Sequence, residues 1–149
     1  MTKFLSTVAL AFPLLQLAAC ADVPRDVRDK AELARFEAYA GAPVREIAYM
    51  GRYQGWKPLS RAEFVLWTTP WQAYLIKVEQ PCADMPFSFS MSLNATEAHV
   101  LQTRADTVKT QGWTCPIEEI RPVDYRRMQA DLKNQAPAAP NAVPAKSVN

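Results

Sequence analysis

The sequence contains few of the residues that most enzymatic and metal sites need. Its 149 residues include one histidine, four glycines and three cysteines. It has no glycine-rich phosphate loop and no G-x-S-x-G nucleophile motif. It also has no C-x-x-C pair, which excludes both a zinc-ribbon spacing and the close dithiol of most redox sites. The composition therefore argues against the common hydrolase, nucleotide-binding and metal-binding classes.

An excess of charge of either sign is also missing. The Lys and Arg side chains number 17 and the Asp and Glu side chains 15, which leaves a formal net charge of +2. Binding to nucleic acid needs a basic patch that releases counterions from the phosphates. The basic run at Arg25, Arg28 and Lys30 does not supply one, because Asp26 and Asp29 alternate with it. We therefore expect no nucleic acid among the partners.

The apolar stretch Phe4–Leu17 is too short to cross a membrane. It has 14 residues and contains Pro13, whereas a spanning helix needs roughly 20 apolar residues. The stretch follows the basic residue Lys3 and is followed by small residues, which is typical of a secretory signal peptide. We predict a signal peptide over residues 1–19, with a buried core helix as the alternative.

The end of this stretch, Leu17-Ala18-Ala19-Cys20, resembles the bacterial lipobox, in which a leucine and two small residues precede an obligatory cysteine. The resemblance implies cleavage between Ala19 and Cys20, a diacylglycerol thioether on the Cys20 sulfur, and usually acylation of the new amino terminus. Each buried methylene contributes ~0.8 kcal/mol, so two or three acyl chains hold a protein at a membrane without a spanning helix. Cleavage after Ala21 stays open as the alternative, because Ala19-Cys20-Ala21 also fits an A-x-A site and would release a secreted protein.

Lipid on Cys20 would leave Cys82 and Cys115 as a pair. An exported protein folds in an oxidising compartment, where a disulfide between them is permitted. A bridge across the 33-residue separation would stabilise the fold by ~3–4 kcal/mol in the chain-entropy model. Two buried thiols are the alternative, and a metal site is disfavoured because His99 is the single histidine.

The residue patterns predict an α+β fold in one globular domain over residues 25–133. Residues 25–40 have apolar side chains at helical spacing and precede Gly41, the expected C-cap. From Val44 the period changes to two, which predicts a small, mainly antiparallel sheet of about five or six strands. Asp124 is the expected N-cap of a short C-terminal helix. Residues 20–24 are predicted to be a tether, and the Pro- and Ala-rich residues 134–149 a disordered tail.

Different sequence patterns predict the individual strands of this sheet. Residues 63–69 and 73–79 are strand-like runs around Pro70-Trp71-Gln72, which predicts a hairpin. Residues 87–93 alternate large apolar side chains with serines, as in a sheet with one solvated face. Residues 54–60 contain Gly and Pro and are expected to be a connection. The further strand candidates are residues 45–53, 99–103, 106–110 and 114–123.

Two longer segments, WKPLSRAEFVLWTTPWQAYLIKVEQPC and CPIEEIRPVDY, resemble a family of short lipoproteins of unknown function from Gram-negative bacteria. The resemblance covers residues 31–126. It implies a helix before a tryptophan-containing sheet and two cysteines, the second in a C-I-x-x-I-x-P-V-D ending. Here Pro116 is inserted after Cys115, which departs from that pattern. The resemblance implies a fold and a location but no activity.

The residues suited to catalysis form no recognisable constellation. His99 has no nucleophile and carboxylate at a spacing that indicates a triad. Glu118 and Glu119 are neighbours, and adjacent residues of a strand point to opposite faces, which makes them a poor acid–base pair. We therefore predict that the protein is not an enzyme and uses no cofactor or metal. A small hydrolytic enzyme remains an alternative.

Aromatic residues favour a binding function instead. The domain contains four tryptophans, and Trp71 lies in the predicted hairpin turn, where burial is difficult. Exposed aromatic side chains often anchor protein partners or sugars. Core packing is the alternative for two or three of the tryptophans. The predicted binding patch consists of Arg52, Tyr53, Trp56 and Trp71.

These features together predict a lipid-anchored protein of the cell envelope that faces the periplasm. Ala21 rather than Asp follows Cys20, which by resemblance to the enteric sorting rule favours the outer over the inner membrane. The predicted role is a binding or interaction module for an envelope protein or a glycan. A structural or envelope-maintenance role without a defined ligand is the alternative.

Overall fold

The structure, a computed structural model, describes residues 24–82, 85, 88 and 90–135. Two helices and eight strands in these residues confirm the predicted α+β class. The predicted signal peptide, Cys20, the tether except Pro24, Phe87, Phe89 and the tail from residue 136 lie outside the described residues. The elements are α1 (Arg25–Ala38), β1 (Glu46–Ala48), β2 (Gly55–Pro58), β3 (Glu63–Thr69), β4 (Gln72–Val78), β5 (Ser92–Asn94), β6 (Val100–Gln102), β7 (Thr107–Thr110), β8 (Trp113–Val123) and α2 (Tyr125–Gln135).

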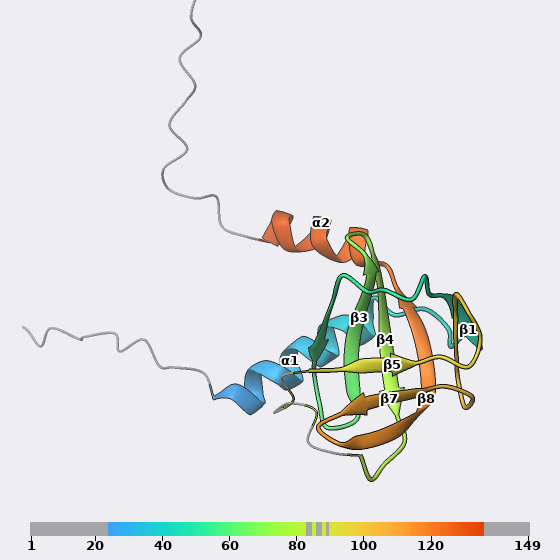
Figure 1. Ribbon diagram of the computed structural model, residues 1–149. Helices are drawn as coiled ribbons and strands as arrows, with labels where there is room; N and C mark the ends of the chain where they lie inside the picture. The colour runs from blue at the N-terminus through green and yellow to red at the C-terminus, as the bar shows by residue number, and fades with distance from the viewer. Residues whose placement is uncertain (1–23, 83–84, 86–87, 89, 136–149) are drawn as a thin grey trace, which may run out of the picture.

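The strands form an antiparallel six-stranded sheet and a smaller two-stranded one. The large sheet has the order β2-β3-β4-β8-β7-β5, and β1 pairs with β6. The long strand β8 pairs with β7 through its first half and with β4 through its second half. Because β8 changes neighbours along its length, the sheet curls, and Figure 1 shows β5 and β7 folded over against β3 and β4.

Two apolar clusters stabilise this arrangement, one on each side of β3 and β4. The first lies inside the curl and includes Phe64, Ile76 and Ile120. The second joins the other face of the same strands, through Val65, to both helices. A strand that is buried on both faces needs a continuous apolar run, and residues 64–66 provide it. Helix α1 therefore lies across the sheet, whereas α2 lies at the end where the β3–β4 hairpin turns (Figure 1).

The end of α1 differs from the sequence-based expectation. Gly41 does not cap the helix, because the C-cap is Tyr39 and Ala40 already forms a β-bridge with Val123. The N–H of Gly41 then donates to the carbonyl of Pro122 at 2.8 Å. The chain leaves the helix early because these residues pair with the edge of β8.

The β3–β4 hairpin is confirmed, whereas three other strand expectations are wrong. Of the candidate over residues 45–53, only Glu46–Ala48 form a strand. Residues 55–58 form the edge strand β2 rather than a connection. An edge strand tolerates Pro58, because a proline lacks only a donor that the edge leaves unused. In the segment 87–93, the strand β5 begins only at Ser92, although Met91 is buried as expected.

The C-terminal helix begins where the sequence predicts. The carboxylate of Asp124 accepts a hydrogen bond from the N–H of Arg127 at 3.1 Å, which confirms the N-cap. Helix α2 extends to Gln135, two residues beyond the predicted end of the domain. Neither helix in the described part of the chain is long and apolar enough to span a membrane.

Candidate functional site: a charged cavity beside a β-bulge

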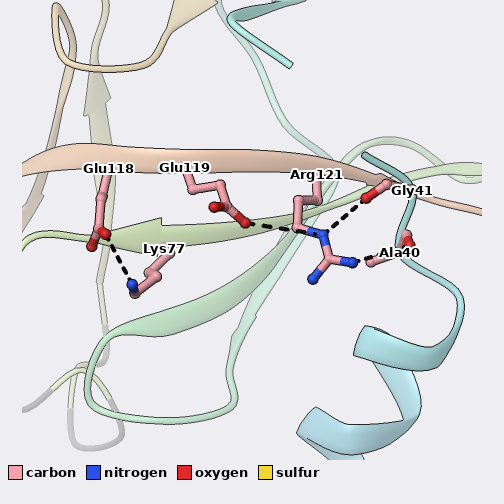
Figure 2. Close-up of polar contacts among 6 residues, drawn as sticks. All are labelled: Ala40, Gly41, Lys77, Glu118, Glu119 and Arg121. Atoms are coloured by element: carbon pink, nitrogen blue, oxygen red, sulfur yellow. Dashed lines mark hydrogen bonds and ion pairs between the residues drawn. The ribbon is translucent and has the colours of Figure 1, made fainter. Parts of the chain in front are cut away.

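A β-bulge in β8 changes the direction of two glutamate side chains. The register between β4 and β8 shifts at Lys77, which leaves Glu118 as the extra residue of β8. Ile117 and Ile120, three positions apart, both belong to the first apolar cluster. The two residues between these isoleucines, Glu118 and Glu119, lie on the same outward side of the sheet, as Figure 2 shows. The expectation that they point to opposite faces is wrong, because strand alternation does not continue across a bulge.

Charged side chains of alternating sign follow one another on this outward side. The ammonium of Lys77 donates to Glu118 Oε1 at 2.9 Å, and this hydrogen bond, together with the charge of Glu118, raises the pKa of Lys77. The Glu119 carboxylate lies 3.9 Å from Arg121 Nε. Figure 2 shows these four side chains along β4 and β8. All four are partly exposed, so their ion pairs contribute little to stability.

Arg121 has a structural role as well as a charge. Its Nε donates to the carbonyl of Gly41 at 2.9 Å and its Nη2 to that of Ala40 at 3.2 Å (Figure 2). These carbonyls belong to the segment that leaves α1. The guanidinium therefore holds the exit of the helix against β8, next to the bulge.

A cavity of about 550 Å³ is partly lined by the two bulge glutamates, Glu118 and Glu119. It is lined by residues 43–46, which lead into β1, by residues 102–104 at the end of β6, and by residues 118–119. This volume is typical of small-molecule sites, roughly 300–1,000 Å³. Its walls are mainly polar, so the arrangement suits a charged ligand better than an apolar one.

The free charges in this cavity come from the two-stranded sheet and its turn. Arg45, Glu46 and Arg104 line it, and none of the three has a side-chain ion pair within the part of the chain that the structure describes. The backbone holds them in place: the N–H of Thr103 donates to the carbonyl of Arg45 at 2.9 Å. The N–H of Arg104 donates to the carbonyl of Ile117 at 2.7 Å, which joins this turn to the bulge.

Within the described residues, no side-chain hydrogen bond, ion pair or ring contact joins two members of the predicted binding patch. Trp56 packs edge-on against Phe64, with ring centroids 6.4 Å apart, and lies beside the first apolar cluster. The Tyr53 hydroxyl donates to the carbonyl of Met91 at 2.5 Å, so it is committed to a structural contact. Arg52 is exposed. Trp71 lies in the β3–β4 turn.

Trp71 is the member of this patch whose ring is most exposed. Its exposed fraction is 59%, and the guanidinium carbon of Arg126 in α2 lies 5.8 Å from the ring centroid, within cation–π distance. Four residues before Trp71, in β3, Trp67 contacts Phe36 and Tyr125 edge-on. The strand that leads into the Trp71 turn is thus packed against both helices.

The cysteine pair is present as a disulfide between Cys82 and Cys115, whose Cα atoms are 5.8 Å apart.

His99 is exposed, and its backbone carbonyl accepts a hydrogen bond from the backbone N–H of Tyr49. The carboxylate of Asp106 is fully buried and bonds to Thr96 and Gln102. Within the described ranges, no group of three or more His, Cys, Asp or Glu residues is placed to hold a metal ion.

Sequence reasoning missed Arg45, Arg104 and Arg126. Each is an isolated basic residue in a chain of balanced charge. The residues beside each of them in the structure include ones from a distant segment of the chain. The bulge did leave a local signal: the buried positions Ile117 and Ile120 break the period of two. That signal could have placed both glutamates on one side, but not the arginines opposite them.

A comparison with protein-family models decides the family. A model described as "Family of unknown function (DUF6491)" matches residues 1–139. The chain belongs to the DUF6491 family. No curated protein and no solved structure matches the chain. Membership of DUF6491 therefore carries no activity with it, and any function must be argued from the residues themselves.

Proposed function

We propose that this DUF6491 protein is a lipid-anchored protein of the bacterial cell envelope that faces the periplasm and binds a partner rather than catalysing a reaction. The observation that carries the proposal is the Cys82–Cys115 disulfide. It accounts for two of the three cysteines, so Cys20 is left over within the lipobox-like Leu17–Cys20. A structural disulfide is also typical of exported proteins and rare in the cytosol of most bacteria.

The position of α1 fits an anchor at Cys20. Four residues separate Cys20 from Arg25, the first residue of α1. The first turns of α1 share a surface pocket with Pro58 and Arg61 at the β2–β3 connection. Lys57 of β2 forms an ion pair with Glu32 in the middle of the helix. A lipid on Cys20 would therefore hold this end of the domain at the membrane surface.

The Trp71 tip lies at the opposite end of β3. This strand has seven residues, which extend about 23 Å at roughly 3.3 Å per residue. The β2–β3 connection is at its beginning and the β3–β4 turn with Trp71 is at its end. An anchored domain would thus present Trp71 and Arg126 away from the membrane. An exposed tryptophan beside an arginine is typical of the residues that dominate binding interfaces.

The anchor is tested on the full chain expressed in a Gram-negative host. Intact-mass analysis is expected to show a chain that begins at Cys20 and carries a diacylglyceryl and an N-acyl group. Density-gradient separation of the envelope is expected to place it in the outer membrane. Cys20→Ala should remove the lipid and the membrane association. An unmodified amino terminus at Asp22 would contradict the anchor and indicate simple secretion.

The binding role is tested by in-cell photocrosslinking in the native host, with a benzoylphenylalanine at position 71. Trp113 supplies the matched control, because it is also an exposed tryptophan in a hairpin, with an exposed fraction of 54%. We expect one dominant protein adduct from position 71 that position 113 does not form, and at least a fivefold lower yield when Arg126→Glu is added. Equal adducts from both positions, or none from position 71, would refute this role for the tip.

A further inference from the structure

The charged cavity beside the bulge has a composition that restricts its ligand. Its lining includes Arg45, Arg104 and Glu46, whose side chains form no ion pair within the described part of the chain. The two bulge glutamates are already compensated, since Glu118 pairs with Lys77 and Glu119 lies near Arg121. Among the residues that the structure describes, the lining charges without an ion pair are therefore of both signs.

A ligand with one charge would pair with only part of this exposed, charged lining. A simple anion would pair with the arginines but would meet the carboxylate of Glu46. A simple cation would pair with Glu46 but would meet two guanidinium groups. Arginine recognises carboxylates through parallel N–H···O bonds, and a carboxylate accepts well from an ammonium. A molecule with one carboxylate and one ammonium satisfies both sides.

We propose that this cavity binds a small zwitterion of α-amino-acid chemistry, a free amino acid or a short peptide with both termini charged. Arg45 and Arg104 take the carboxylate, and Glu46 takes the ammonium. The amide of Gln102 and the hydroxyl of Thr103, which also line the cavity, supply neutral hydrogen-bonding groups. The cavity volume of about 550 Å³ exceeds what a dipeptide needs, so the ligand enters with its water.

This site shares no residue with the Trp71 tip and does not need the lipid anchor. Its failure and the failure of the proposed function are therefore separate outcomes. Crosslinking at Trp71 reports on the tip, whereas binding of a small peptide reports on the cavity.

The test uses the full-length chain in detergent micelles and equilibrium dialysis with radiolabelled L-alanyl-L-alanine. We expect saturable binding, and at least tenfold weaker binding of N-acetyl-alanyl-alanine, which lacks the ammonium, and of alanyl-alanine amide, which lacks the carboxylate. Arg104→Gln should weaken binding of the dipeptide at least tenfold. Arg35→Gln, an exposed arginine of α1 outside the cavity, should leave it unchanged.

A second variant assigns the ammonium end. Glu46→Gln should weaken binding of alanyl-alanine at least fivefold but leave the weak binding of the N-acetyl form unchanged, because that form has no ammonium to lose. This difference between two ligands does not arise from a general loss of folding. The proposal is overturned if no saturable binding occurs, if the three peptides bind equally, or if neither Arg104→Gln nor Glu46→Gln alters binding.

Discussion

Replacement of both Cys82 and Cys115 by alanine is expected to lower the free energy of unfolding by ~3–4 kcal/mol. The bridge closes a loop across a sequence separation of 33 residues, and the chain-entropy model assigns about this value to such a loop. It ties the segment that follows β4 to the first part of β8, where β8 pairs with β7. Without it, the curl of the sheet depends on strand pairing and the apolar clusters.

The measurement is urea-induced unfolding of the wild type and the double variant, each with and without a reductant. Cys115 is buried in the first cluster, so part of the loss on substitution comes from packing. The reductant separates the two effects: it should destabilise the wild type by most of the expected amount and leave the double variant unchanged. A wild type whose unfolding midpoint does not respond to the reductant would contradict a stabilising bridge.

Asp106→Asn is expected to destabilise the protein by ~2–3 kcal/mol. The buried carboxylate accepts hydrogen bonds from the N–H and the hydroxyl of Thr96, both at 2.7 Å, and from the N–H of Gln102 at 2.6 Å. An asparagine amide has one acceptor oxygen, so its NH₂ group would face one of these donors. The lost bond and the unsatisfied donor both lower stability, because water cannot reach the site.

Asp124→Asn is the matched control for this change. Asp124 also accepts a backbone hydrogen bond, from the N–H of Arg127, but it is exposed and caps a helix. Asparagine and aspartate are about equally good N-caps, so we expect a change below ~0.5 kcal/mol. Unfolding in urea measures both, and amide hydrogen exchange at Gln102 should quicken only in Asp106→Asn. Equal stability of the two variants would refute the role assigned to the buried carboxylate.

Local patterns predicted the parts of the fold that depend on neighbours in sequence. The β3–β4 hairpin follows from two strand-like runs around a turn, and the α2 cap follows from Asp124 before helix-forming residues. The exposure of Trp71 also follows, because a two-stranded turn offers few neighbours to cover a large ring. The disulfide could be inferred by counting cysteines once the lipobox resemblance assigned Cys20 to lipid.

The misplaced strands show where such patterns fail. Strand β2 contains Gly55 and Pro58, residues that normally interrupt strands, and it exists because β3 offers a free edge to pair with. Gly41 has the position of a helix cap, but pairing with β8 removes the chain from α1 before that residue. In both cases a hydrogen-bonding partner far along the chain outweighed the local propensity.

By itself, the sequence determined the α+β class, the central hairpin, the exposed tryptophan and the two cysteines available for a bridge. Its balanced charge and single histidine are also the basis on which we expect binding rather than catalysis. Only the tertiary structure decided that Glu118 and Glu119 share one side and that Arg45 and Arg104 lie in a common cavity with them. The bulge depends on the register between β8 and β4, which the sequence of β8 does not show. The cavity is lined by three distant segments, so no local sequence pattern in any one of them indicates it.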